Sequence, residues 1–188
     1  LVLCFFLTFF IGRPASGQSD RRYRHAIDDP LGRQKSHVYD VTDPFVVRGF
    51  TVDPEQLKKI LTTGIKRISG IDDPARAWHY FIHDDDVVAL VFSPVGAPEL
   101  GTSDELAEVL LEILLENGFK KKNLMLVGLE HLPKNAQGTR LWTYGWGEKD
   151  VDFGSGKDRL AKWLDEVTAI INLPTLMDDR IFHLRGAL

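Results

Sequence analysis

The sequence predicts an α+β fold, with a small mixed sheet, an N-terminal hairpin and two helices packed on the sheet. The expected order is β-β-α-β-β-α-β, followed by a C-terminal helix. Two segments with helical spacing of apolar residues alternate with short apolar runs typical of strands. Turn-forming residues separate these segments. The chain has 188 residues, of which 44% are hydrophobic, so it can build one domain with an ordinary core.

The first expected elements form the hairpin and a helix. Residues 37–41 and 45–52 are β-rich runs on either side of a Thr-Asp-Pro turn. Asp53-Pro54-Glu55 then provides a capping carboxylate, a proline at the first helical position and an acid in the first turn. A helix is therefore expected from residue 54, and Gly70 is expected to end it.

The following elements alternate between strands and helices. Residues 77–83 and 87–95 are expected to be strands around an acidic turn, and residues 104–118 carry the strongest helical pattern of the chain. Residues 123–130 form a continuous apolar run, as in the strands of a covered sheet. A last amphipathic helix is expected from residue 157, because apolar residues recur at helical spacing there: Leu160, Trp163, Leu164, Val167 and Ile171.

The N-terminal residues 1–17 are excluded from the fold prediction. They begin with a run of apolar residues that is too short to span a bilayer comfortably. Ala15-Ser16-Gly17 fits the small-residue pattern of a signal-peptidase site, but no basic residues precede the apolar run. Two interpretations stay open, a signal or membrane-targeting segment and the start of a fragment. Residues 18–36 are polar and are interpreted as a linker.

Composition excludes several classes of function. The net charge is −4 and no stripe of basic residues alternates with aromatic ones, so we do not expect a nucleic-acid partner. The single cysteine, Cys4, excludes an internal disulfide framework. His79 and His83 are four residues apart, but they lie in an expected strand without a third ligand. We therefore predict no metal site.

Two motifs have a functional and a structural interpretation. Residues 154–158, Gly-Ser-Gly-Lys-Asp, resemble part of a phosphate-binding loop, and their simpler interpretation is a glycine-rich entry to the last helix. Trp142, Tyr144 and Trp146 alternate, which places them on one face of an extended segment. That face would stack against a sugar or a base, or pack against the neighbouring helix at Trp163. The second interpretation is preferred.

Two further segments are informative together. Residues 45–61, FVVRGFTVDPEQLKKIL, resemble the signature that opens the C-terminal lid subdomain of acyl-adenylate-forming enzymes. Residues 132–142, LPKNAQGTRLW, resemble the signature that closes the same subdomain. Their separation and the expected elements between them also fit this family. The resemblance covers residues 37–142, as a lid-like α+β domain, and leaves residues 143–188 as an aromatic, glycine-rich segment with the C-terminal helix.

The resemblance implies a specific function. In this superfamily, which includes acyl-CoA synthetases and fatty acyl-AMP ligases, a large N-terminal domain holds ATP or AMP with Mg²⁺, and the lid swings over it. The chain would then be a fragment that is inactive alone and binds no cofactor by itself. Its partners would be that adenylating domain and an acyl carrier or CoA. Such a ligase fragment would be cytoplasmic.

The resemblance also assigns roles to individual residues. The catalytic lysine of the family aligns with Thr139, which implies a catalytically weakened lid similar to divergent, disco-interacting-protein-like members. A positioned cation stabilises the charge that develops during adenylation, and a neutral hydroxyl cannot replace it. The assigned residues are Thr139 and Arg140 as catalytic, Arg48, Gly49, Lys134 and Gly138 as substrate-binding, and Thr42 and Asp43 as the hinge.

An alternative function belongs to a different class. The apolar N-terminus and the alternating Trp142, Tyr144 and Trp146, called the aromatic ladder below, are also typical of a secreted or membrane-anchored α+β binding module without catalysis. Its location would be extracellular or membrane-associated. The sequence alone leaves both functions open.

Overall fold

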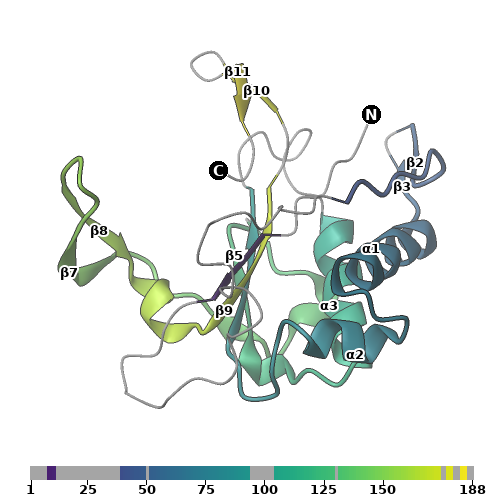
Figure 1. The fold of residues 1–188 in the computed structure, drawn as a ribbon, viewed down its shortest axis with the longest axis horizontal. Helices are drawn as coiled ribbons and strands as arrows, with labels where there is room; N and C mark the ends of the chain where they lie inside the picture. The colour runs from purple at the N-terminus through teal and green to yellow at the C-terminus, as the bar shows by residue number, and fades with distance from the viewer. Residues whose placement is uncertain are drawn as a thin grey trace, which may run out of the picture.

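The computed structural model describes residues 8–11, 39–49, 51–93, 104–129, 131–174, 177–179 and 183–185. The fold is α+β, with one larger sheet and the three α-helices gathered on one side of it (Figure 1). The helices are α1 (Pro54–Ser69), α2 (Pro74–His79) and α3 (Asp104–Glu116), with the short 3-10 helices η1 (Lys121–Asn123), η2 (Lys134–Ala136) and η3 (Lys162–Glu166).

The larger sheet has five strands in the order β1-β9-β4-β5-β6. Strands β9, β4, β5 and β6 run parallel to one another, and β1 pairs antiparallel with β9. The strands of this sheet are β1 (Thr8–Ile11), β4 (Val88–Phe92), β5 (Leu124–Val127), β6 (Arg140–Leu141) and β9 (Ala169–Leu173). The sheet thus combines strands from both sides of residue 142, together with residues 8–11 of the apolar N-terminal segment.

The remaining strands form three small antiparallel pairs. They are β2 (Val47–Arg48) with β3 (Thr51–Val52), β7 (Trp146–Asp152) with β8 (Lys157–Ala161), and β10 (Met177–Asp179) with β11 (His183–Arg185). In Figure 1 the β2–β3 and β7–β8 hairpins lie at opposite ends of the view, with the large sheet between them. Within the described ranges, no helix combines the length and the apolar character needed to cross a membrane.

Alternating side chains divide the sheet into two faces. Val88, Leu90 and Phe92 of β4 join the main core with the three helices. Ala89 and Val91 face the opposite side, where a smaller cluster surrounds Trp163. Burying one large aliphatic side chain contributes about 1.5–3 kcal/mol. The main core buries many more such side chains than the cluster around Trp163, so the helix-covered face provides most of the stability. The largest fully buried side chains are Trp78, Leu57, Ile65, Ile82, Leu90, Leu110, Leu111, Ile113, Leu114, Leu124, Met125 and Ile171.

Helices α1 and α3 form where the sequence predicts them. The Asp53 carboxylate accepts hydrogen bonds from the amides of Glu55 and Gln56, at 3.1 and 3.2 Å. Gly70 ends α1 with a φ of 69°, a left-handed conformation that favours glycine. The four apolar positions of α1 that repeat at helical spacing face the core: Leu57, Ile60, Leu61 and Ile65.

The prediction of a strand at residues 77–83 is wrong, because α2 occupies the first part of this segment. Asp73 caps α2 by accepting a hydrogen bond from the Arg76 amide at 2.8 Å, and Pro74 follows at the first helical position. This is the same signal as Asp53-Pro54. Trp78, only 1% exposed, then anchors the short helix in the main core.

The prediction of a C-terminal helix is also wrong. Residues 157–173 form β8, η3 and β9 in succession. Leu160 is 43% exposed on β8, whereas Ile171 is fully buried in β9, so the helical spacing of these residues has no structural counterpart. Apolar and β-branched residues 169–171 pair in register with residues 88–90 of β4, and this pairing outweighs the helical periodicity.

The N-terminal hairpin is present, but its strands differ from the prediction. Both strands, β2 and β3, lie inside residues 45–52, and residues 39–43 form no strand. The Asp43 carboxylate accepts a hydrogen bond from the Phe45 amide at 2.9 Å, which turns the chain before β2. Residues 37 and 38, also part of the predicted first strand, lie outside the described residues.

Candidate functional site

The residues assigned to the hinge and to the Arg-Gly motif lie together beside α1. Asp43 stabilises the turn before β2, and Thr42 is exposed next to it. The Arg48 guanidinium lies over the Phe45 ring, 5.9 Å from the ring centre. Gly49 has a φ of 64° at the hairpin turn, and nothing lies within 4 Å of the position that a Cβ would take. These residues form a small exposed turn, not an enclosed site.

The loop at residues 131–139 is held against α3 by Glu108. The Asn135 side-chain amide donates a hydrogen bond to the Glu108 carbonyl at 2.9 Å, and the Lys134 backbone amide lies 3.4 Å from the Glu108 carboxylate. Pro133 and Ala136 are the buried residues of this loop, whereas Lys134 is exposed. This loop is therefore a fixed element on the edge of the helix layer.

Thr139 and Arg140 have different structural partners. The Thr139 hydroxyl and amide both donate to the Ala136 carbonyl, at 2.8 and 3.0 Å, which closes the turn that contains Gly138. Arg140 lies opposite Met125 in β6, on the sheet face away from the helices. Its Nη2 lies 3.6 Å from the Glu166 carboxylate, which also accepts a hydrogen bond from the Thr143 hydroxyl. The positive charge of Arg140 is therefore partly compensated by the Glu166 carboxylate of η3.

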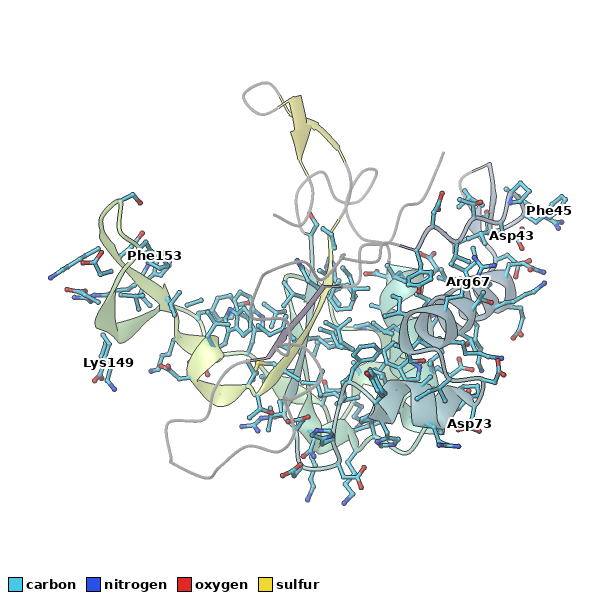
Figure 2. The ribbon with its side chains drawn as sticks, in the orientation of Figure 1. Asp43, Phe45, Arg67, Asp73, Lys149 and Phe153 are labelled. Atoms are coloured by element: carbon cyan, nitrogen blue, oxygen red, sulfur yellow. The ribbon has the colours of Figure 1, made fainter. Side chains whose placement is uncertain are left out.

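The assigned residues form two separate groups. The first group, around Arg48, lies at the β2–β3 hairpin. The second group is the loop with Lys134, Gly138 and Thr139, which packs on α3. Arg140 directly follows this loop and pairs with Glu166 of η3. Figure 2 shows Asp43 and Phe45 at the end of the molecule far from the β7–β8 hairpin. Within this chain, the described contacts do not bring the two groups into one site.

The histidine pair has structural contacts. His79 stacks on Phe119, with 4.5 Å between ring centres, and its ring nitrogens face the Asp84 carboxylate at 3.3 Å and the Asn117 carbonyl at 3.0 Å. His83 uses its backbone amide to bind Asp86. In the part of the chain that the structure describes, no group of three or more His, Cys, Asp or Glu side chains is arranged to hold a metal ion.

The aromatic ladder is divided between the core and the surface. Trp142 packs with the cluster around Trp163, and its ring centre lies 4.0 Å from that of Tyr144. Tyr144 is 73% exposed and Trp146 is 68% exposed. The preferred interpretation of core packing therefore holds only for Trp142. Sequence reasoning missed Phe153, 55% exposed at the hairpin tip, although the glycines that follow it indicate a turn there.

The β7–β8 hairpin, which carries Trp146 and Phe153, is a two-stranded antiparallel sheet. Arg159 and Asp150 face each other across the strands, with Nε 3.1 Å from the carboxylate oxygen. The Phe153 amide donates to the Gly156 carbonyl at 2.9 Å, and Gly154 has a φ of 80° at the tip. The glycine-rich motif at residues 154–158 therefore forms a hairpin tip and does not precede a helix. Figure 2 shows Lys149 and Phe153 on this hairpin, away from the core.

Comparison with known proteins adds no relative: no protein-family model, no curated protein and no solved structure matches the chain.

Proposed function

We propose that this chain is an α+β binding module that recognises a protein partner through the β7–β8 hairpin. The observation that carries this proposal is the exposure of Tyr144, Trp146 and Phe153 on and beside one hairpin. Tyrosine, tryptophan and phenylalanine are enriched in protein interfaces, because their large rigid rings give much contact area for little entropy. Large exposed apolar surfaces mark interaction sites, and these rings lie along the hairpin from the start of β7 to its tip.

The charges of the hairpin favour a protein over a polyanion. Residues 146–162 carry four acidic and four basic side chains, Glu148, Asp150, Asp152 and Asp158 against Lys149, Lys157, Arg159 and Lys162. Such a balanced surface does not attract nucleic acid by charge, and it resembles the polar rim that surrounds the apolar core of a protein interface.

The geometry of the hairpin favours an extended peptide as the bound segment. β7 and β8 pair only with each other among the described strands, so the outer edges of this sheet keep unused backbone donors and acceptors. A peptide that adds a strand to one edge gains main-chain hydrogen bonds, while Trp146 and Tyr144 provide side-chain specificity. A two-stranded sheet alone is marginally stable in water, and a third strand would stabilise it.

Selection from a displayed library of random peptides tests the proposal. Peptides selected on the wild-type protein should bind with a Kd of about 10 μM or less, measured by the fluorescence of the exposed Trp146 or by calorimetry. Trp146→Ala should weaken binding by about 30-fold, the effect of losing one interface hot spot. Phe45→Ala is the matched control, since Phe45 is 60% exposed but lies on the opposite hairpin. A selection without binders, or binders insensitive to Trp146→Ala, would contradict the proposal.

A second proposal keeps the resemblance to the lid of acyl-adenylate-forming enzymes. It is supported by the Arg48-Gly49 turn, which is exposed and whose left-handed glycine leaves room for another group to approach the backbone closely. Thr42 and Asp43 would then be the hinge, and ATP with Mg²⁺ would be held by a separate N-terminal domain. Residues 77–83 weaken this proposal, because the family order expects a strand where α2 lies.

Adenylate formation in trans, with the N-terminal domain of an acyl-adenylate-forming enzyme, tests the second proposal. Thr139→Lys should raise the rate of acyl-adenylate formation, because a cation at this position stabilises the developing charge on the reacting oxygens. Thr139→Met is the control, since it adds length without charge. If Thr139→Lys changes neither the rate nor the nucleotide affinity of the mixture, the assignment of the loop to an active site is wrong.

A further inference from the structure

The two strands of the β7–β8 hairpin turn specific backbone groups toward their outer edges. The Phe153 amide donates a hydrogen bond to the Gly156 carbonyl, so these two residues are a hydrogen-bonded pair of the ladder. In an antiparallel ladder such pairs alternate with pairs whose backbone groups point outward. The outward pairs of this register are Asp152 with Lys157 and Asp150 with Arg159. Asp150 and Asp152 therefore offer backbone donors and acceptors at the edge of β7.

The edge of β8 is partly closed by one of its own side chains. The Arg159 amide points outward on β8 and donates a hydrogen bond to the Asp158 carboxylate at 2.7 Å. A peptide that added to β8 would have to displace this carboxylate before it could bind the amide. On β7, the Asp152 carboxylate accepts from the Gly154 amide at the hairpin tip, at 2.8 Å, so it does not cover an outward amide of its own strand. The edge of β7 is therefore the more open of the two for strand addition.

The two faces of β7 differ in character. Residues paired across a ladder share a face, and so do residues two positions apart in one strand. The register places Asp150, Asp152 and Trp146 on one face. Val151, half-buried, and Phe153, exposed, lie on the other. A strand added to β7 therefore meets carboxylates and an indole ring on one face and apolar side chains on the other.

Charge selects the kind of segment that fits this edge. β7 carries the acidic residues Glu148, Asp150 and Asp152 against one basic residue, Lys149. Arg159 of β8 compensates Asp150, with 3.1 Å between Nε and the carboxylate oxygen, whereas no ion pair within the described residues compensates Asp152. Opposite charges on neighbouring strands stabilise a sheet and like charges destabilise it. A basic side chain beside Asp152 therefore fits, whereas β7 of a second copy would set carboxylate against carboxylate.

We propose that the partner segment is an extended peptide that adds to the edge of β7 and alternates basic with apolar residues. This inference rests on the proposed function, because it names the partner of the same hairpin. The lysine or arginine side chains of the peptide lie on the face of Asp152 and Trp146, where a cation also approaches the indole ring. Its apolar side chains lie on the face of Val151 and Phe153. Backbone hydrogen bonds at Asp150 and Asp152 fix its position along the strand.

A fluorescein-labelled peptide of alternating lysine and valine tests the proposal, with fluorescence anisotropy as the measure of binding. It should bind the full chain with a Kd on the order of 100 μM, since one added strand makes a small interface. Its controls are a peptide of alternating glutamate and valine, and a peptide of the same lysine–valine composition with the lysines in one block. The glutamate peptide should bind at least about tenfold more weakly, and the block peptide about threefold. Equal binding of either control, or no binding of the alternating lysine peptide, would overturn the proposal.

Substitutions on the two strands locate the bound peptide. Asp152→Asn keeps an acceptor for the Gly154 amide and removes the charge, so it should weaken binding of the lysine peptide about threefold. Asp158→Ala should change the affinity by less than about twofold, because Asp158 is exposed on β8 and water screens its charge. A clear gain of affinity in Asp158→Ala would place the peptide on the edge of β8. That result, or an Asp152→Asn variant that binds as well as the wild type, would overturn the proposal.

Amide hydrogen exchange separates the failure of this inference from the failure of the proposed function. With the lysine peptide bound, the amides of Asp150 and Asp152 should exchange more slowly, and the amide of Lys157 should not change. Binding that depends on Trp146 but protects the Lys157 amide overturns this inference alone, as do Trp146-dependent peptides without basic residues. Binding that Trp146→Ala leaves unchanged contradicts the proposed function as well.

Discussion

Lys58 connects α1 to α3, and its replacement by methionine should weaken this contact. Its Nζ lies 2.7 Å from Glu112 Oε1 and 2.7 Å from Glu116 Oε1. Hydrogen bonds to Glu112, the largest cause, and to Glu116 raise the pKa of Lys58 above its ordinary value of 10.5. A raised pKa means that the folded state favours the charged lysine. The contribution to stability is therefore complete below pH 10.5 and is lost as the pH rises through the folded pKa.

Solvent exposure limits the size of this contribution. The Lys58 side chain is 27% exposed and the two glutamate side chains are 52% exposed, so water screens both pairs. An exposed ion pair contributes about 0.2–1 kcal/mol, and two pairs that share one ammonium contribute about 1 kcal/mol together. Glu112 and Glu116 are one turn apart and repel each other once Lys58 is gone, which adds about 0.3 kcal/mol. Lys58→Met should therefore lower the free energy of unfolding by about 1–1.5 kcal/mol.

Urea unfolding near pH 7 measures this loss. Lys59→Met is the control, because Lys59 is the exposed neighbour on the same helix and has no ion pair in the described structure. The loss caused by Lys58→Met should exceed that of Lys59→Met, and should shrink in about 1 M salt, where the Debye length is about 3 Å. It should also shrink in a Glu112→Gln, Glu116→Gln background. Equal losses for both lysines, or a loss that is independent of salt and background, would refute this explanation.

Three other substitutions have defined expectations in the same assay. Asp53→Ala should lower the free energy of unfolding by about 1 kcal/mol, because it removes the cap of α1. Asp53→Asn should keep most of the stability of the wild type, since asparagine also caps helices. An alanine variant as stable as the wild type would contradict the capping role of Asp53. Asp86→Ala should cost about 1–3 kcal/mol, because the Asp86 carboxylate accepts hydrogen bonds from the Thr168 hydroxyl at 2.8 Å and the His83 amide at 2.7 Å. Trp146→Ala should change the free energy of unfolding by less than about 0.5 kcal/mol, and a larger loss would place this ring in the fold and not at a binding surface.

The elements that the sequence predicts correctly are those with local causes. α1 follows from the Asp53-Pro54 cap and the Gly70 stop, and the buried strand β5 follows from its continuous apolar run. Each of these signals acts within a few residues of the chain. The α+β class follows from the same local signals, because it requires only the presence of both kinds of element.

The errors concern competition between local signals and pairing at long range. At residues 77–83 the aromatic run favoured a strand, but the Asp73-Pro74 cap lay just before it and determined a helix. At residues 169–173, pairing with β4 and β1 outweighed a helical period that spans β8, η3 and β9. The β4–β9 pairing joins residues 81 positions apart, as Val88 and Ala169 show (169 − 88), and no local pattern encodes which strands become neighbours.

The partition of apolar side chains explains why the β7–β8 hairpin is the stronger candidate for recognition. The main core is complete without it, because α1, α2, α3 and the large sheet bury their apolar faces against one another. Trp142 closes the smaller cluster on the other face, so the ladder contributes to folding only at its first ring. Tyr144 and Trp146 are mostly exposed, so they add little to either cluster. Their apolar surface is therefore not required for the stability of the fold. Under the proposed function, Trp146 would stabilise a complex more than the free chain, in contrast to Trp163, which is nine-tenths buried.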